Sequence, residues 1–463
     1  MRTSFLAGGV LALASFAAPA LGDTSSREVQ SAVDAYLASA KADTGLVGGA
    51  GQAGYDDGFW IRGGTFLLKI NLLLQTRWEG FDWDDTAVEP GPGGDLSGFS
   101  LPRAVLKFSG DATCSVHYYA ELEFGHEGSL GDNEANVNFT NFVYHYNGTP
   151  SADDASDGPG SARDFMREHE AGVLREGWIE YAASAHANLR VGLVATPTTR
   201  QLMTPPEMQQ FVDISMASAF IGAGMPGYSD RNRDYGALFH GACGCDEQFQ
   251  YMLAVTNGDG PVHRNVLDGE TSDGFAYSAR LNWDIKGHLG YEEGALASHE
   301  CDWAASVGAW GHYYTDALQH NPYAKFADRL TWGVDAAFRW GGLSLTAAFS
   351  SFTWDDNRGI IDVEGTSYLV QAGYLFPGTA WELAARYSAY TFDDNLSDTS
   401  LAGSEIGVAV NYYIDGHADK VTLDVAMISG DDDGNFLGDV YAGYSATFDS
   451  DAVMVRLQWQ LAL

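Results

Sequence analysis

Some residues in this sequence have the types and spacing that catalysis requires. Glu121 and Glu123 are two positions apart, so on a strand both carboxylates would face the same side, as the two acids of a glycosidase must. No nucleophile–base pair or metal motif accompanies them, and the plainer interpretation is that they line a polar interior. The sequence therefore predicts no catalytic residue and no enzymatic activity.

Candidate metal ligands are also present, but their spacing matches no common type of site. Cys243 and Cys245 are separated by one residue, whereas zinc sites usually place at least two between paired cysteines. Asp431–Asp433 precede a glycine and would supply oxygen ligands for calcium, yet the spaced ligands of an EF-hand loop are missing. The following histidines also lack ligand spacing: His117, His126, His145 and His169. The sequence thus predicts neither a dedicated metal site nor a cofactor.

The elements that must position these residues are β-strands, because apolar and polar residues alternate along the chain. A strand turns successive side chains to opposite faces, so a period of two favours strands over helices. From Phe66 onward, one face carries Phe66, Leu68, Ile70, Leu72, Leu74 and Trp78, and the other carries Lys69, Asn71, Gln75 and Arg77. The final residues repeat the pattern, with Val453, Val455, Leu457, Trp459, Leu461 and Leu463 opposite Met454, Arg456, Gln458 and Gln460.

Strands of this kind recur through most of the chain and predict one large all-β domain. They lie near residues 66–79, 100–109, 116–126, 173–183, 188–195, 233–241, 247–256, 275–284, 303–313, 329–340, 343–353, 365–376, 380–392, 403–413, 419–428 and 451–463. This count of about sixteen is even, as it is in most bacterial membrane-spanning β-barrels.

The connections between these strands alternate in length. Short ones such as Ser184–Ala187 and Gly341-Gly342 alternate with long ones such as Glu127–Gly172 and Thr196–Asn232. Tight turns at one rim and long loops at the other are typical of outer-membrane barrels. The predicted fold is therefore a transmembrane antiparallel β-barrel of about sixteen strands, with short periplasmic turns and long extracellular loops.

The N-terminal part predicts export. Residues 1–22 combine a charged start, an apolar stretch and small residues suited to cleavage, as in a secretory signal peptide. Residues 23–57 hold a short amphipathic helix, which begins near Ser25, and a Gly-rich spacer, and we expect them on the periplasmic side. The barrel then occupies residues 58–463, and the localisation that follows is the outer membrane.

A series of short motifs in a fixed order runs from Asp57 to Leu463. The first part comprises Asp57-Gly58-Phe59-Trp60-Ile61-Arg62, Val191-Gly192, Pro197, Gln201, Phe211-Val212-Asp213, Arg233-Asp234-Tyr235-Gly236 and Thr256-Asn257-Gly258-Asp259-Gly260. The second comprises Pro377-Gly378, Trp381-Glu382-Leu383-Ala384-Ala385-Arg386-Tyr387, Asn411-Tyr412-Tyr413 and Gly416-His417. In order and spacing, these motifs resemble the phosphate-selective porin O/P family. The resemblance implies a β-barrel pore, commonly trimeric, that passes small hydrophilic solutes and in some members prefers phosphate.

The charge distribution bears on what could pass. The formal net charge of −37 argues against nucleic acid as a partner, because nucleic acid requires basic surface. The acidic excess gathers in the long loops, whereas the polar strand faces carry a mixed and somewhat basic set. These pore-lining candidates are Lys69, Arg77, Arg103, Lys107, Glu121, Glu123, Arg190, Arg280, Asp335, Arg339, Glu382, Arg386, Asp424 and Arg456. They either steer ions through the lumen or neutralise one another across neighbouring strands.

The long segment Thr196–Asn232 is the best candidate for a loop that folds inward and narrows the pore. It follows the fifth predicted strand, and rings of charge at a constriction set selectivity. The constriction candidates on it and just after it are Arg200, Asp213, Asp230, Arg231 and Arg233.

The chain has four cysteines, and all of them fall in or beside the predicted periplasmic turns. They are Cys114, Cys243, Cys245 and Cys301. The periplasm is oxidising, so disulfides are reasonable there, and four cysteines allow three pairings. A bridge between Cys243 and Cys245 would be strained, which favours links between different turns.

Two functions from different classes remain open. One is a passive outer-membrane diffusion channel, expected as a homotrimer in lipid, for small hydrophilic solutes or ions that include phosphate or other anions. The other is a structural or adhesive barrel whose acidic loops bind divalent cations or surface partners. The fold is shared, so it does not separate them. An open, conducting lumen supports the first, and a lumen plugged by Glu127–Gly172 or Thr196–Asn232 supports the second.

Overall fold

The structure is a computed structural model. It describes residues 51–56, 58–83, 96–124, 173–184, 186–223, 233–244, 247–258, 275–296, 302–315, 328–355, 362–394, 399–430 and 452–463. The predicted signal peptide, the N-terminal helix and the Asp431–Asp433 loop lie outside these residues. Residues Ala53–Leu463 form one compact unit, separate from Met1–Gln52.

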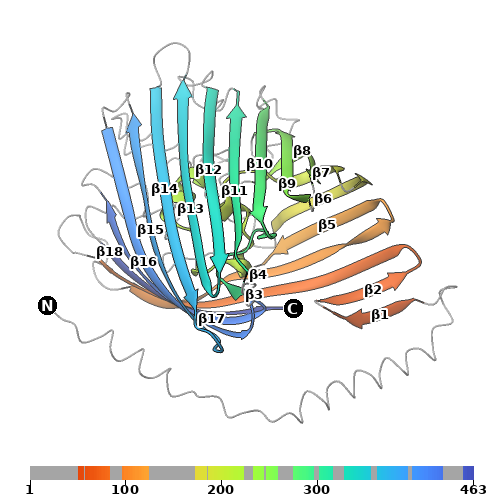
Figure 1. Ribbon diagram of the computed structural model, residues 1–463, viewed down its shortest axis with the longest axis horizontal. Helices are drawn as coiled ribbons and strands as arrows, with labels where there is room; N and C mark the ends of the chain where they lie inside the picture. The colour runs from red at the N-terminus through yellow and green to blue at the C-terminus, as the bar shows by residue number, and fades with distance from the viewer. Residues whose placement is uncertain are drawn as a thin grey trace, which may run out of the picture. The chain divides into compact units, whose positions relative to one another are not determined.

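The strands of this unit form a closed antiparallel barrel (Figure 1). Two short strands, β1 (Gln52–Tyr55) and β2 (Phe59–Gly63), come first, and β2 pairs with the start of β3. The barrel strands in its first half are β3 (Phe66–Trp83), β4 (Leu96–Thr113), β5 (Val116–Glu123), β6 (Val173–Ser184), β7 (Ala187–Ala195), β8 (Arg233–Cys243), β9 (Phe249–Thr256) and β10 (Ala276–Lys286). Those in its second half are β11 (Ala304–Tyr314), β12 (Asp328–Trp340), β13 (Leu343–Asp355), β14 (Asp362–Leu375), β15 (Trp381–Asp394), β16 (Thr399–Asp415), β17 (Asp419–Gly430) and β18 (Ala452–Ala462). Each pairs with the next in chain order, and β18 closes the ring on β3.

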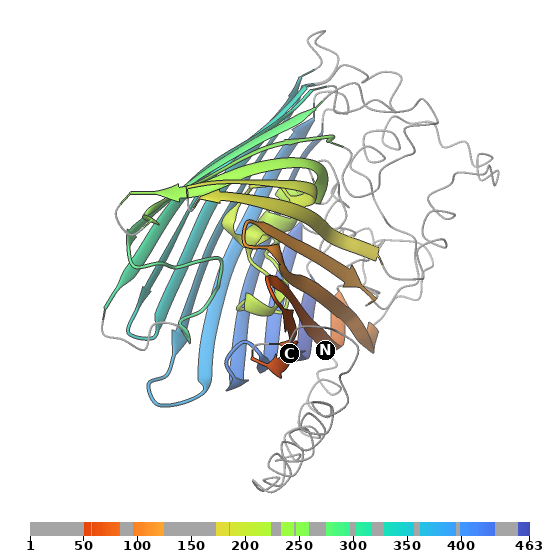
Figure 2. The same cartoon turned by 90° about the vertical axis from the view of Figure 1, so that its right-hand side faces the viewer.

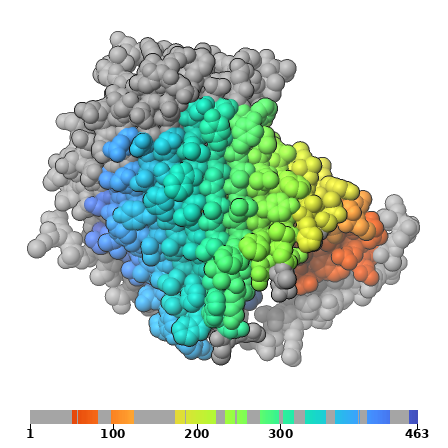
Figure 3. Space-filling view, turned by 45° about the horizontal axis from the view of Figure 1, so that its top comes forward, coloured from red at the N-terminus to blue at the C-terminus, as the bar shows by residue number. Residues whose placement is uncertain are grey.

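The alternation in the sequence becomes the inside and outside of the wall, which confirms the predicted fold class. Along β10, Ser278, Arg280 and Asn282 are buried inside, while Leu281 and Trp283 are exposed outside. The outer face is the apolar one, as a barrel in lipid requires, and Figure 3 shows this face over the green to blue strands. Aromatic pairs lie on it, with the rings of Trp381 and Tyr412 centred 4.6 Å apart.

Among the register shifts in the described strands, two lie beside charged residues of the interior. The β3–β4 register shifts between Gln75 and Arg77, near the buried Pro102. The β5–β6 register shifts after Glu121, which leaves Arg175 as the extra residue of β6. As a result the side chains of two neighbouring residues, Arg175 and Glu176, are both buried. A bulge places two residues opposite one and re-aims their side chains, which explains why a strict period of two fails here.

Within the residues that the structure describes, two chain segments fold into the barrel. The first, here called the inner segment, comprises residues 196–223 between β7 and β8 and contains α5 (Arg200–Met203), the 3-10 helix η1 (Pro206–Met208) and α6 (Met216–Ala223). Figure 2 shows it in yellow-green, surrounded by strands. Its Phe220 ring packs on Phe352 of β13 and Tyr390 of β15, with centroids 5.4 Å and 4.4 Å away. Among the residues that the structure describes, no helix has the length and hydropathy needed to cross a membrane.

The second is the connection from β10 to β11, whose residues 287–296 are here called the turn connection. It leaves from the rim where the other connections are short, such as Gly341-Gly342 between β12 and β13. Gly341 and Gly342 both adopt positive φ, which suits a two-residue hairpin turn. The alternation of short and long connections therefore has an exception at β10–β11, where the turn connection buries Leu289 and Ala295.

Candidate functional site in the barrel lumen

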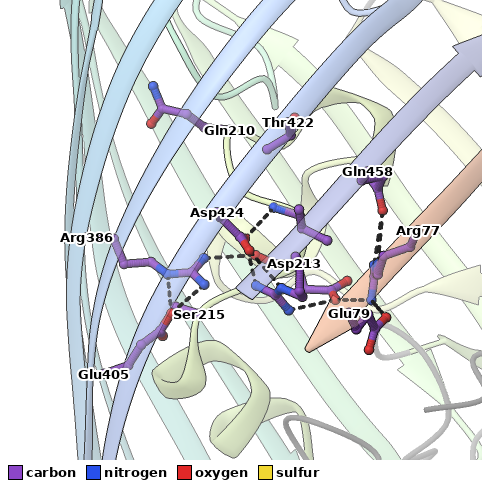
Figure 4. Close-up of polar contacts among 12 residues, drawn as sticks. Arg77, Glu79, Gln210, Asp213, Ser215, Arg386, Glu405, Thr422, Asp424 and Gln458 are labelled. Carbon is purple, nitrogen blue, oxygen red and sulfur yellow. Dashed lines mark hydrogen bonds and ion pairs between the residues drawn. The ribbon is translucent and has the colours of Figure 1, made fainter. Parts of the chain in front are cut away.

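The inner segment is held in the lumen by an acid surrounded by three arginines. Asp213 lies 2.9 Å from Arg77 of β3, and Figure 4 shows these two residues side by side. It also lies 3.1 Å from Arg103 of β4 and 3.2 Å from Arg456 of β18. Burial alone raises the pKa of Asp213, but the three guanidinium groups outweigh it and hold that pKa below its usual range. The carboxylate is therefore charged at neutral pH.

Wall carboxylates balance these arginines and also bind the segment's backbone. Arg77 pairs with Glu79 at 3.0 Å, and Arg456 pairs with Asp424 at 2.7 Å. The Asp424 carboxylate also accepts a hydrogen bond from the Val212 amide at 3.1 Å. The cluster is thus a network of opposite charges that joins the segment to β3, β4, β17 and β18.

A second network ties α6 to the wall. Arg386 of β15 and Glu405 of β16 form an ion pair at 2.5 Å whose side chains are 0% exposed. The Met216 amide donates to Glu405 at 2.9 Å, and Arg386 donates to the Asp213 carbonyl at 2.8 Å. The guanidinium of Arg386 also lies 4.2 Å from the Phe211 ring centre. This pair therefore fixes both ends of the stretch between Asp213 and α6.

A third network holds α5 against β10 and β12. Arg280 makes two hydrogen bonds of 2.7 Å to the two oxygens of Asp335, and both side chains are 1% exposed. The Arg200 amide donates to Asp335 at 3.1 Å, and Arg280 donates to the Thr198 carbonyl at 2.6 Å. The Arg200 guanidinium in turn donates to the Gly290 carbonyl of the turn connection. Bidentate geometry gives such a pair both strength and a fixed direction.

Three basic side chains inside β4–β9 keep more contact with solvent. Lys107 of β4 bonds Glu207 of the inner segment and stays 18% exposed. Glu180 of β6 accepts from Arg190 at 2.9 Å and contacts His240 at 2.8 Å, and these two partners are each 21% exposed. Beside them, the Arg190 guanidinium lies 3.7 Å from the Trp178 ring centre.

The interior therefore has two sides. On the packed side, formed by β10–β17, the inner segment covers the wall and the ion pairs are dry. On the accessible side, formed by β4–β9, Lys107, Arg190 and His240 are 18–21% exposed, although Arg103 and Glu121 on the same strands are only 6% exposed. On both sides, basic side chains form close ion pairs with acidic ones.

The structure places the predicted pore-lining residues as follows. On the accessible side, Glu121 and Glu123 both contact Arg175, at 3.1 Å and 3.0 Å, so this acid pair is engaged with a cation. On the packed side, Arg339 of β12 lies 3.6 Å from Glu292, and Glu382 of β15 accepts from Gln210 at 2.8 Å. Lys69 is on the same face of β3 as the buried Gln75.

The predicted constriction residues separate into three groups. Arg200 and Asp213 both lie on the inner segment, and the networks above bring them to the wall. Arg233 is the first residue of β8, where it pairs with Glu176 at 3.1 Å. Asp230 and Arg231 lie outside the described residues.

Sequence reasoning missed several interior charges. Glu405 and Lys420 are in phase with the interior faces of their predicted strands, so the alternation could have found them. Arg175 was hidden by the bulge, which breaks that phase. Glu293 lies on the turn connection, a stretch without strand periodicity, and its only signal is the set of glycines at 287, 290 and 294.

The cysteines and histidines take ordinary positions where they are described. Cys114 and Cys243 are exposed free thiols, and Cys245 and Cys301 lie outside the described residues. His117 contacts Asp111 at 2.6 Å, and His126, His145 and His169 lie outside the described residues. Within the described ranges, no group of three such ligand side chains comes together in a metal-binding arrangement.

Comparisons with known proteins agree with this architecture. The family model of phosphate-selective porin O and P matches residues 312–461. An anion-selective porin from Comamonas acidovorans superposes with a TM-score of 0.55 at 13% identity, over 86% of this chain and 100% of that one. OmpF of Salmonella typhi in complex with daunomycin gives 0.51 at 12% identity, over 89% and 100%. The trimer form of OmpT, an outer membrane protein of Vibrio cholerae, gives 0.50 at 10%, over 86% and 100%.

No curated protein matches the chain. The solved structures establish the fold, and the family match covers β12 to β18 and part of β11. The chain therefore has the fold of outer-membrane porins, with an apolar outer face, and its residues 312–461 resemble the phosphate-selective porin O and P family.

Proposed function

We propose that this protein is a passive diffusion channel for small hydrophilic solutes and ions, and that they pass along the accessible side of the lumen. The observation that carries the proposal is the inner segment, because Asp213 fastens it to β3, β4 and β18 and the buried pairs fasten it to β10, β12, β15 and β16. Because these contacts with the wall hold the segment in place, it narrows the lumen even though its own helices are short. The path that remains borders Lys107, Arg190 and His240.

We propose further that the channel has no marked preference for phosphate. Preferential passage of an anion requires basic side chains whose charge is not already neutralised. Here Arg77, Arg103 and Arg456 surround Asp213, and Arg190 shares Glu180 with His240. Balanced pairs of this kind support a lumen that favours polar over apolar solutes and distinguishes weakly between anions and cations.

The working unit in this proposal is a homotrimer that carries out no catalysis. The support for the trimer is the trimer form of the Vibrio cholerae protein, whose fold is shared. The support for a channel without catalysis is the porin fold together with the use of Glu121 and Glu123 as partners of Arg175. The signal peptide of residues 1–22 and export to the outer membrane complete the proposal.

The test is the reversal potential of the purified, refolded protein in a planar bilayer under a tenfold gradient of potassium chloride. We expect measurable conductance and a reversal potential close to zero, because paired charges give little net field. A strongly anion-selective potential that added phosphate collapses would contradict the proposed lack of phosphate preference. A complete lack of conductance would contradict the channel itself and favour the structural or adhesive barrel.

A further inference from the structure

The turn connection reaches the inner segment from the opposite rim and contacts it at several points. The Glu293 amide donates to the Met208 carbonyl at 2.9 Å, and Gly290 accepts from Arg200. Tyr291 lies between two guanidinium groups, with its ring centre 5.5 Å from both Arg200 and Arg280. The chain then turns at Gly294, where φ is +79° and an added Cβ would approach a Glu382 oxygen to 3.1 Å. The connection is therefore folded to fit closely against the segment and the wall.

The carboxylate of Glu293 is the acceptor at the centre of this contact. It is buried, and it accepts hydrogen bonds from the Gln201 side chain, the Gln210 backbone amide and the Gln371 side chain, each at 2.9 Å. These donors belong to α5, to the chain after η1 and to β14. One side chain thus joins two points of the inner segment to the barrel wall.

The Gln201 side chain links Glu293 to Ser215, and this link requires one orientation of the Gln201 amide. The Gln201 side-chain oxygen accepts from the Ser215 amide at 2.8 Å and from the Ser215 hydroxyl at 2.7 Å. Its nitrogen must then point at Glu293. Because a carboxylate only accepts hydrogen bonds, Glu293 fixes the direction of the Gln201 amide, which in turn holds the residue just before α6.

We infer that Glu293 is a positioning residue for the inner segment, and that the turn connection fastens this segment against the packed side. The inference rests on the proposed function, since it assigns Glu293 a part in holding the pore open on the accessible side. A carboxylate is needed because an amide at this position would turn a donor toward the Gln201 donor. The Gln201 amide could avoid that contact only by turning a donor toward the Ser215 amide.

The first experiment compares Glu293→Gln with the swapped pair Glu293→Gln/Gln201→Glu. In the swapped pair, the new amide at position 293 accepts from Gln210 and Gln371 and donates to the new carboxylate at position 201. That carboxylate accepts from Ser215, so each hydrogen bond has a donor and an acceptor again. Asp302→Asn is the matched control, because Asp302 is an exposed acid near the same connection, where it pairs with Lys286.

The readout is the labelling rate of a cysteine placed on α6, Ser218→Cys, with the four native cysteines replaced by serine. Ser218 is buried, so the thiol is protected while the segment is docked. We expect Glu293→Gln to raise the labelling rate about tenfold or more, since it leaves a buried donor unsatisfied and promotes local opening. We expect the swapped pair to restore protection and Asp302→Asn to leave it unchanged. Equal rates in Glu293→Gln and Asp302→Asn, or no restoration by the swap, would overturn the inference.

Open-channel current noise in the same variants gives a second measurement. We expect sub-conductance levels in Glu293→Gln, their loss in the swapped pair, and a single level in Asp302→Asn. A single level in Glu293→Gln would contradict the positioning role. The labelling assay needs no current, so a wild-type protein that does not conduct would refute the channel and would leave the docking result to decide on Glu293.

Discussion

The packed and accessible sides of the lumen use the same residue types for different ends. On the packed side, Arg386 and Glu405 are fully buried, and a segment of chain lies over them and exchanges hydrogen bonds with the same groups. On the accessible side, Arg190 and His240 pair with Glu180 at 2.9 Å and 2.8 Å, but each of these two partners is 21% exposed. Burial, and not the pairing itself, therefore decides what an interior charge does. A dry pair fixes a structure in place, whereas a wet pair presents a polar surface to whatever passes.

The largest expected effect of breaking this difference is on stability. We expect Arg386→Met to lower the free energy of unfolding by about 3–5 kcal/mol, because it leaves Glu405 buried and charged without its partner. The comparison variant on the accessible side is Arg190→Met, for which we expect a loss of about 1 kcal/mol or less, because Arg190 is 21% exposed and Glu180 keeps His240 as a partner. Urea unfolding in lipid vesicles, followed by tryptophan fluorescence, measures both. Equal losses of unfolding free energy in the two variants would show that burial does not separate the ion pairs of the packed side from those of the accessible side.

A smaller effect is expected on selectivity when the acid at the centre of the arginine cluster is neutralised. We expect Asp213→Asn to raise the anion-to-cation permeability ratio by roughly two- to fivefold, because Arg77, Arg103 and Arg456 then exceed their remaining acids by one charge. The reversal potential under a salt gradient measures it, with Asp302→Asn as the exposed control. A shift of the same size in the control would mean that any acid on the molecule has this effect.

The smallest effect concerns pH. Burial raises the pKa of Asp213 and the three arginines lower it by more, so the net direction is down. The stability that Asp213 contributes is then fully present above its unfolded pKa of about 3.9 and is lost only as pH falls through the lowered folded value. We therefore expect the wild-type channel and Asp213→Asn to show the same dependence of selectivity on pH between pH 4 and 6, because Asp213 does not titrate in that range. A titration in that range that Asp213→Asn abolishes would place the Asp213 pKa in the ordinary range and contradict the cluster.

The sequence predicted the wall well and the contents of the lumen only in part. Alternation from Phe66 onward places most of the apolar strand residues outside, because lipid and water impose that period on the strands, although some, such as Phe352 and Tyr390, pack inside against the inner segment. It also predicted that Asp213 and Arg200 lie on a segment folded inward. Which arginine meets which acid depends on strand register, which alternation does not specify. The pairing of Arg386 with Glu405 is therefore visible only in the structure.

The turn connection shows the other limit. Residues 287–296 have neither strand nor helix periodicity, and their place is set by contacts with residues far away in the chain, such as Gln201 and Gln371. The glycines at 287, 290 and 294, all with positive φ, indicate a tightly turning backbone but not where it goes. Arg175 was not among the predicted pore-lining residues for a local reason: a bulge shifts the inside–outside alternation on which that prediction depends.

The most direct test of the two-sided lumen is the reaction of single cysteines with a charged methanethiosulfonate reagent during current recording, with the native cysteines replaced by serine. His240→Cys and Met252→Cys place the thiol on the accessible side, and Ser344→Cys and Ser388→Cys place it on the packed side. We predict rapid reaction and a stepwise fall in current for the first two, and no reaction for the last two. Reaction at Ser344→Cys and Ser388→Cys with protection of His240→Cys and Met252→Cys would contradict the assigned path.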